Sequence, residues 1–269
     1  MSTPHGNDID GTVPANGPLT GRTALVTGGG RGIGAEISRG LARAGARVAL
    51  LGNGLEHLTR LAGELPHDPI VVRADLSRPE APEAALREVT DRFGRLDILV
   101  NNAGFGTFGP SDEVTPEMYD DFMAVNLRAP LLLAGQAARH MADHGGGSIV
   151  HISSGIGASG NTGWVLYSAA KGGMEAAART LTAEWGPHNV RFNTVRPAVI
   201  RTSAAWPPPG WDEAAYLRSV PLRRMQEATD VADAVLFLAG DSARNISGAF
   251  VDVDGGWGAV KPSVVGADA

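Results

Sequence analysis

The sequence predicts a single-domain α/β protein of the doubly wound, Rossmann type, with a parallel seven-stranded sheet and helices on both faces. Three observations lead to this prediction. Short apolar runs alternate with longer amphipathic segments from Arg22 onward. A glycine-rich turn separates the first apolar run from the first helical pattern. The 269 residues fit one large domain, and no internal repeat or second domain is evident.

The elements follow one another in a regular order. The predicted strands are short and apolar and cover 23–27, 47–51, 69–75, 96–104, 147–154, 190–197 and 248–256. Helical spacing predicts helices over 33–46, about 80–93, about 119–141, 167–185 and 229–240, the last capped by Thr229 or Asp230. Because strands and helices alternate, the strands are expected to be parallel and joined by right-handed crossovers.

Composition limits the classes of function. The net charge is −6 and no basic block stands out, so nucleic acid and membrane are not expected as partners. The chain has no cysteine, which excludes thiol catalysis, disulfides and thiolate zinc sites. The first 18 residues are predicted to be a flexible lead-in and not a signal peptide, residues 19–258 the domain, and 259–269 a tail. No apolar run approaches the roughly 18 residues of a membrane span. A soluble, cytoplasmic protein is expected.

The glycine-rich turn, TGGGRGIG over 27–34, predicts a dinucleotide site. Glycines permit a tight turn and close approach to a ligand, and the following helix N-terminus suits a pyrophosphate. The spacing of Gly28, Gly32 and Gly34 differs from the usual G-x-G-x-x-G fingerprint. A glycine-rich turn without a ligand is the alternative.

Tyr167 and Lys171 are four residues apart on a predicted helix, so their side chains share one face. A nearby ammonium lowers the pKa of a phenol, which could then exchange a proton with a substrate oxygen. A surface tyrosine beside an ordinary lysine is the alternative. Ser154 and the NNAG segment at 101–104 both end strands, where ligands bind in such sheets, which favours the catalytic interpretation.

Taken together, these motifs resemble the short-chain dehydrogenase/reductase family across roughly residues 18–258. The matching features are TGGGRGIG, Asp75 in ADL, NNAG, Asn126, Ser154, Tyr167, Lys171, Thr202 and DGG at 254–256.

The resemblance implies a role for each matching residue. Tyr167 would be the general acid or base, Lys171 would lower its pKa and bind the nicotinamide ribose, Ser154 would donate to the substrate oxygen, and Asn126 would hold a water. The implied cofactor contacts are Gly28, Arg31, Gly32, Ile33, Gly34, Asn53, Asp75, Leu76, Asn102, Ala103, Gly104, Tyr167, Lys171, Pro197, Val199 and Thr202.

The end of the second strand bears on the choice of cofactor. Gly52 stands where the family's NAD enzymes carry an acid, and Asn53 stands where a basic residue would favour NADP. Arg31 could meet a 2′-phosphate, so NADP is favoured over NAD. Ala198 departs from the family's Pro-Gly pair, and its methyl fits only if φ stays negative.

The substrate side is less defined by sequence. A variable segment at about 202–225 holds WPPPGW, which is either a stiff connector or a lid. The candidate substrate residues are Phe105, Gly155, Ile156, Trp164, Trp206 and Trp211, which favour a neutral, fairly apolar ketone or alcohol. His140 and His144 lack a completing carboxylate, so no metal is expected.

The sequence therefore predicts an NAD(P)-dependent oxidoreductase, in particular an NADPH-dependent ketoreductase. The alternatives are an NAD-dependent secondary alcohol dehydrogenase of the same fold and a nucleotide-sensing binding protein without turnover. Small residues on more than one face of the helix at 167–185 predict a homo-oligomer, and the family implies a tetramer or a dimer.

Overall fold

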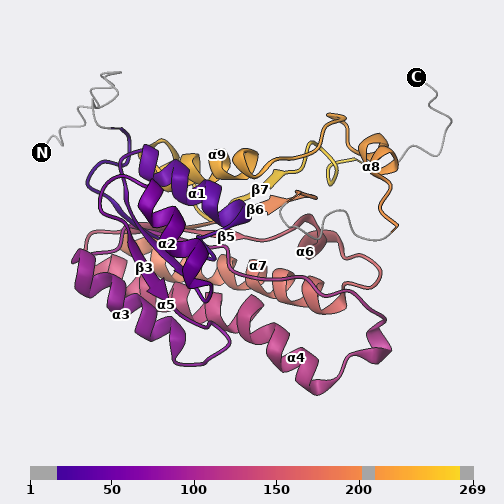
Figure 1. Cartoon of the computed structure of the whole chain (residues 1–269), viewed down its shortest axis with the longest axis horizontal. Helices are drawn as coiled ribbons and strands as arrows, with labels where there is room; N and C mark the ends of the chain where they lie inside the picture. The colour runs from indigo at the N-terminus through magenta and orange to yellow at the C-terminus, as the bar shows by residue number, and fades with distance from the viewer. Residues whose placement is uncertain (1–16, 202–209, 261–269) are drawn as a thin grey trace, which may run out of the picture.

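A seven-stranded parallel sheet forms the centre of the protein (Figure 1). The computed structural model describes residues 17–201 and 210–260. The strand order is β3-β2-β1-β4-β5-β6-β7, and every neighbouring pair is parallel. The chain reverses its direction of travel across the sheet between β1 and β4, as in a doubly wound fold. The predicted fold class is confirmed.

The strands lie within the predicted apolar runs or extend them by one residue. They are β1 (Thr23–Thr27), β2 (Arg47–Gly52), β3 (Ile70–Arg73), β4 (Ile98–Asn101), β5 (Gly147–Ile152), β6 (Val190–Pro197) and β7 (Phe250–Val253). Every residue of β1 and β4 is buried, because both faces of the sheet are covered.

Two layers of helices cover the sheet. One core joins it to α1 (Gly32–Arg43), α2 (Leu55–Glu64) and α9 (Ala228–Ala239). The other joins it to α3 (Ala81–Phe93), α5 (Ala129–Asp143) and α7 (Val165–Trp185). The shorter elements are η1 (Ser111–Glu113), α4 (Pro116–Met123), η2 (Ala124–Arg128), α6 (Gly155–Ser159), η3 (Gly186–His188), α8 (Glu213–Ser219) and η4 (Asp241–Ala243). Within the described ranges, no helix is long and apolar enough to cross a membrane.

The helix predicted over about 119–141 is helical throughout, but it is not one regular α-helix. The segment forms α4, a π-helical turn η2 and then α5. Pro130 lies in the first turn of α5 and has no N–H, so it is unable to continue the hydrogen-bond ladder back to Asn126. Asn126 therefore lies in a π turn, a local geometry that is frequent at functional sites.

Two other helix predictions need correction. No helix was predicted over 55–64, although leucines recur there at helical spacing and α2 buries Leu58 and Leu61. The cap of α9 is Glu227, and neither Thr229 nor Asp230 takes that position. Asp230 instead closes a capping box by accepting a 2.9 Å hydrogen bond from the Glu227 N–H.

Candidate functional site

The glycine turn joins the end of β1 to the start of α1. Gly28 and Gly32 have φ of +63° and +53°, a region that other residues rarely adopt. A Cβ on Gly34 would lie 2.1 Å from the Gly28 carbonyl oxygen, so this position has no room for a side chain. Arg31 begins α1 without a side-chain cap, and the first turn holds no acidic residue. The free N–H groups and positive helix end fit the pyrophosphate of a dinucleotide.

A hydrogen-bond network holds the end of β4 against this turn. The Thr27 hydroxyl accepts bonds of 2.9 Å from the N–H groups of Asn102 and Ala103. The Asn102 amide donates to the Thr27 carbonyl at 2.9 Å. A Cβ on Gly28 would lie 3.0 Å from the Asn102 amide nitrogen, so the two segments are in close contact. The network fixes Asn102, Ala103 and Gly104 beside the glycine turn.

The ends of β2 and β3 form the adjoining part of the site. Gly52 pairs with Arg73 in the strand register, and a Cβ on Gly52 would meet only Leu58, at 3.7 Å. Asn53 is exposed and Leu76 is buried. Asp75 accepts a 3.0 Å hydrogen bond from the Ser77 N–H, and its hydrogen bonds to Ser77 lower its pKa. The carboxylate that would repel a 2′-phosphate is absent from the end of β2.

Tyr167 and Ser154 meet at the carboxyl end of β5. Ser154 is the N-cap of α6, and its hydroxyl accepts from the Ile156 N–H at 3.3 Å. Burial raises the pKa of the Tyr167 phenol above its ordinary value, and a hydrogen bond with Ser154 opposes that rise. That Lys171 lowers this pKa as well stays a prediction.

Lys171 lies one helical turn after Tyr167 on α7. Its ammonium is 5.6 Å from the centroid of the Tyr167 ring and donates a 2.8 Å hydrogen bond to the Ile152 carbonyl. Burial lowers the pKa of Lys171 to about 8, and the charge of Glu175 opposes this change. The lysine is 7% exposed, so its charge is poorly screened by solvent.

Asn126 is the fourth predicted catalytic residue, after Ser154, Tyr167 and Lys171. Its amide donates to the Phe122 carbonyl at 3.1 Å, and its oxygen accepts from the Phe105 N–H at 3.2 Å. A Cβ on Gly104 would lie 2.7 Å from that oxygen and 3.7 Å from the Lys171 ammonium. Gly104 therefore lies close to both side chains, and a side chain there would displace Asn126.

Helices α6 and α7 touch through glycine. A Cβ on Gly157 would lie 2.8 Å from the Lys171 Cβ, and one on Gly172 would lie 3.2 Å from the Gly157 carbonyl oxygen. The segment that carries Ser154 is thus packed closely on the helix that carries Tyr167 and Lys171.

Aromatic rings surround Tyr167. Trp164 meets Tyr167 edge-on at 5.6 Å between centroids, and Phe108 meets Trp164 in the same way at 5.7 Å. Phe122 lies 6.3 Å from Tyr167 and 5.1 Å from Phe105. We call Phe105, Phe108, Phe122 and Trp164 the aromatic collar. Phe108 is 70% exposed, so part of the collar is open to a ligand.

A second wall follows the end of β6. The Val199 N–H donates to the Tyr216 hydroxyl at 3.3 Å, and Trp211 lies 5.2 Å from the Tyr216 ring. Ala198 donates to the Gln226 side-chain oxygen at 2.9 Å and does not have a positive φ, so its methyl is tolerated. Thr202 and Trp206 lie outside the described residues.

Comparisons with known proteins agree with this geometry. A family model described as enoyl-(acyl carrier protein) reductase matches residues 28–258. The chain is 40% identical to L-xylulose reductase of Bos taurus over 243 residues, 89% of this chain and 97% of the relative. The chain belongs to the short-chain dehydrogenase/reductase family. It is therefore an NAD(P)-dependent oxidoreductase.

Two solved structures of this family share the fold. The angucycline C-6 ketoreductase LanV, with bound NADP, has a TM-score of 0.84 at 35% identity, over 91% of this chain and 98% of its own. The 3-ketoacyl-(acyl-carrier-protein) reductase of Brucella melitensis, complexed with NADH, has a TM-score of 0.84 at 29% identity, over 89% and 99%.

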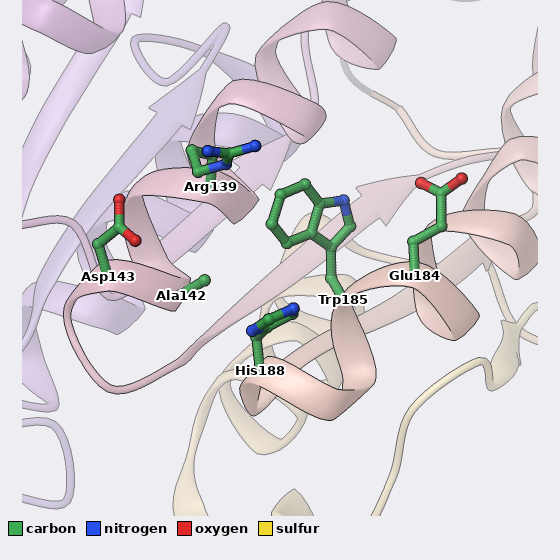
Figure 2. A pocket seen from close by; sticks show the side chains of 6 residues that line it. All are labelled: Arg139, Ala142, Asp143, Glu184, Trp185 and His188. Carbon is green, nitrogen blue, oxygen red and sulfur yellow. The ribbon is translucent and has the colours of Figure 1, made fainter.

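A cavity of about 510 Å³ lies away from these residues (Figure 2). Figure 2 shows the Trp185 indole in the middle of this cavity, with Arg139 and Asp143 on the α5 side. Tyr167 and Trp185 lie on the same helix, separated by about 27 Å at about 1.5 Å per residue. This short-chain dehydrogenase/reductase therefore has its candidate catalytic group and this cavity at opposite ends of α7.

His140 and His144 do not form a metal pair. Their rings stack at 4.0 Å, and the His140 ring nitrogen Nε2 accepts from the Leu96 N–H at 3.2 Å. In the part of the chain that the structure describes, no group of three histidine or acidic residues could hold a metal ion.

Sequence reasoning missed several side chains near the site. Phe108 belongs to a loop without a clear period, and Phe122 lies on the predicted helix at 119–141 but far in sequence from the other site residues. Trp257 faces Gly155, where an added Cβ would lie 3.3 Å from its ring. Glu175 lies four residues after Lys171, so the spacing that identified Lys171 could have found it.

Proposed function

We propose that this chain is an NADPH-dependent ketoreductase that acts on a fairly apolar, ring-bearing ketone, with Tyr167 as general acid. The observation that carries the proposal is the contact between the hydroxyls of Ser154 and Tyr167 inside the aromatic collar, with the buried Lys171 ammonium beside them. Two hydroxyls that meet at one point suit a substrate carbonyl oxygen.

The nicotinamide supplies hydride chemistry, and this chain's residues would bind and orient it. The glycine turn with Arg31 and Ile33 would hold the phosphates. Asp75 and Leu76 would meet the adenine. The remaining contacts are proposed for Asn53, Asn102, Ala103, Gly104, Pro197, Val199 and Thr202.

Proton transfer would run through the side chains at the end of β5. The Tyr167 phenol would donate its proton to the carbonyl oxygen while Ser154 donates a hydrogen bond to the same atom. The Lys171 charge would stabilise the phenolate that this transfer leaves. Asn126 would hold a water that returns a proton from solvent.

The preference for NADPH follows from charge. No carboxylate ends β2 at Gly52, and the Arg31 guanidinium is exposed beside the glycine turn. A guanidinium binds a phosphate through paired hydrogen bonds, so Arg31 suits a 2′-phosphate.

The aromatic collar supports an apolar substrate. Trp164 and Phe122 flank Tyr167, Phe108 and Phe105 extend the collar from them, and ring-bearing ligands pack well on such edges. Ile156, Trp211 and Gly155 with its neighbour Trp257 would line the other side. A cytoplasmic homo-oligomer, tetramer or dimer, is part of the same proposal, and the exposed small residues Ala169 and Ala176 on α7 suit a subunit contact.

A paired titration tests the proposal. The five tryptophans report binding of NADPH and NADH, and NADPH consumption is then followed with tetralone, an aromatic bicyclic ketone, and with L-xylulose. We expect tighter NADPH binding and faster turnover of tetralone. Tighter NADH binding with oxidation of the matching alcohol would favour the secondary alcohol dehydrogenase. Binding without turnover of any carbonyl or alcohol tested would favour a nucleotide sensor.

A further inference from the structure

A buried carboxylate lies one helical turn beyond Lys171. Glu175 is 4% exposed and accepts a 2.6 Å hydrogen bond from the Ser153 hydroxyl. Arg196 on β6 binds it through two bonds, 2.8 Å from Nε to Oε1 and 2.5 Å from Nη2 to Oε2. Such a forked guanidinium–carboxylate pair fixes the position of the acid.

Several groups hold Arg196 in turn. Its guanidinium lies 4.5 Å from the centroid of the Phe250 ring, and its Nη1 is 3.6 Å from Asp252 on β7. Arg179, on the outer side of α7, lies over the same Phe250 ring at 5.1 Å. Arg196 is therefore fixed by its neighbours and has one partly exposed acid, Asp252, besides Glu175.

The titratable groups that face Lys171 lie on α7 and β5. Tyr167 and Glu175 precede and follow it on α7, and His151 lies on β5. Burial lowers the pKa of His151 to about 3, so its ring is neutral at pH 7. Arg196 is paired with Glu175 and lies 3.6 Å from Asp252. A Cβ on Gly157 would lie 2.8 Å from the Lys171 Cβ and 3.2 Å from Glu175 Oε1, so the carboxylate lies beside Lys171. Glu175 is thus the anion that opposes the cost of burying the Lys171 ammonium.

We propose that Glu175 is a positioning residue for catalysis, which keeps the ammonium of Lys171 charged beside Tyr167. Ser153 and Arg196 hold the carboxylate in place from the sheet side. The inference rests on the proposed function, because it assigns Glu175 a part in the reaction of Tyr167.

The charge of Lys171 is measurable without cofactor or turnover. The chain has two lysines, Lys171 and Lys261, so ¹³C-lysine-labelled protein gives signals from two side chains, and Lys261→Arg assigns them. We expect the Lys171 signal to titrate near pH 8 in the unmodified chain and about 1 unit or more lower in Glu175→Gln. An unchanged titration would overturn the proposal.

Control variants distinguish the loss of the Glu175 charge from a general effect on folding. Glu184→Gln removes an acid from the other end of α7 and should leave the Lys171 titration in place. Arg196→Gln removes the partner of Glu175 but not the acid, so Lys171 should titrate near its original pH. If Glu175→Gln does not fold, the double variant Glu175→Gln/Arg196→Gln removes both buried charges, and its Lys171 should still titrate lower.

The pH profile of tetralone reduction gives the kinetic test. In Glu175→Gln the high-pH loss of kcat should begin about 1 unit lower, with NADPH affinity changed less than about 3-fold. A profile equal to that of the unmodified enzyme would overturn the role of Glu175 alone. Absence of turnover in the unmodified enzyme would overturn the proposed function, while the lysine titration would still stand.

Discussion

Gly104 lies so close to Asn126 that a single added carbon would reach 2.7 Å from the asparagine oxygen. The contact is with the end of a side chain and not with backbone, so the asparagine would have to move while the backbone stays in place. Its displacement would break the 3.2 Å bond to the Phe105 N–H. A change at Gly104 should therefore affect the position of Asn126 more than the stability of the fold.

Gly104→Ala should therefore reduce kcat about 10-fold while the melting temperature stays nearly unchanged. Steady-state kinetics with tetralone measure kcat, and thermal unfolding measures the melting temperature. Gly109→Ala is the matched control, since a Cβ there would meet nothing within 4 Å. Equal kinetics of the two variants would contradict the role of Asn126.

Tyr167→Phe should bind NADPH normally and lose about 10²–10⁴-fold in turnover, because the ring remains and the proton donor is removed. Quenching of tryptophan fluorescence measures NADPH binding in this variant. Tyr119→Phe, at a tyrosine 48% exposed on α4, is the control. Near-normal turnover of Tyr167→Phe would exclude it as the general acid.

Gly52→Asp should shift the ratio of NADPH to NADH efficiency toward NADH by about 10-fold or more. The new carboxylate would bind ribose hydroxyls and repel a 2′-phosphate. The fold should tolerate it, because a Cβ there meets only Leu58 at 3.7 Å. The ratio of kcat/KM for the two coenzymes is the measurement. An unchanged ratio would show that position 52 does not contact the ribose.

Trp164→Ala should raise KM for tetralone about 10-fold and leave KM for L-xylulose within about 2-fold, because it removes an aromatic edge beside Tyr167. Phe237→Ala, which removes an exposed ring on α9, is the control. Equal losses for both substrates would indicate a structural role for Trp164.

His151 should make the fold sensitive to acid. Its pKa is lowered to about 3 from an ordinary 6.5, mainly by burial. Below pH 6.5 the unfolded chain binds a proton that the folded chain does not, so stability falls as the pH drops from 6.5 toward 3. His151→Asn should lose less stability between pH 7 and about pH 4 than the unmodified chain, measured by urea unfolding. The exposed His188→Asn serves as control, and equal pH dependence in His151→Asn would contradict this assignment.

Most of the fold could be predicted from the sequence, because the patterns that indicate strands and turns are local. Each strand is a short apolar run, and glycine turns mark where β1 meets α1. The helix α2 was missed although its signal is also local, because Leu55, Leu58 and Leu61 recur at helical spacing. The π turn at Asn126 escaped because its cause, Pro130, acts through a backbone bond that periodicity does not show.

Some residues of the candidate site follow from local sequence, and others do not. Tyr167 and Lys171 follow from spacing on one helix. The pairing of Glu175 with Arg196 requires α7 to pack on β6, and the meeting of Phe108 with Trp164 requires two separate loops to converge. Such contacts depend on the tertiary arrangement, so local sequence does not predict them.

The glycine contact between α6 and α7 has a consequence for how a substrate is admitted. Ser154, Tyr167 and Lys171 belong to two elements packed backbone to backbone at Gly157 and Gly172, so they move as one body. The opposite side, from Phe105 to Gly109, meets the rest of the site through one backbone bond from Gly109 to Gly163, through the bond from the Phe105 N–H to Asn126, and through ring contacts of Phe105 and Phe108. We therefore expect substrates of different width to displace that loop rather than the closely packed segments that carry Ser154, Tyr167 and Lys171.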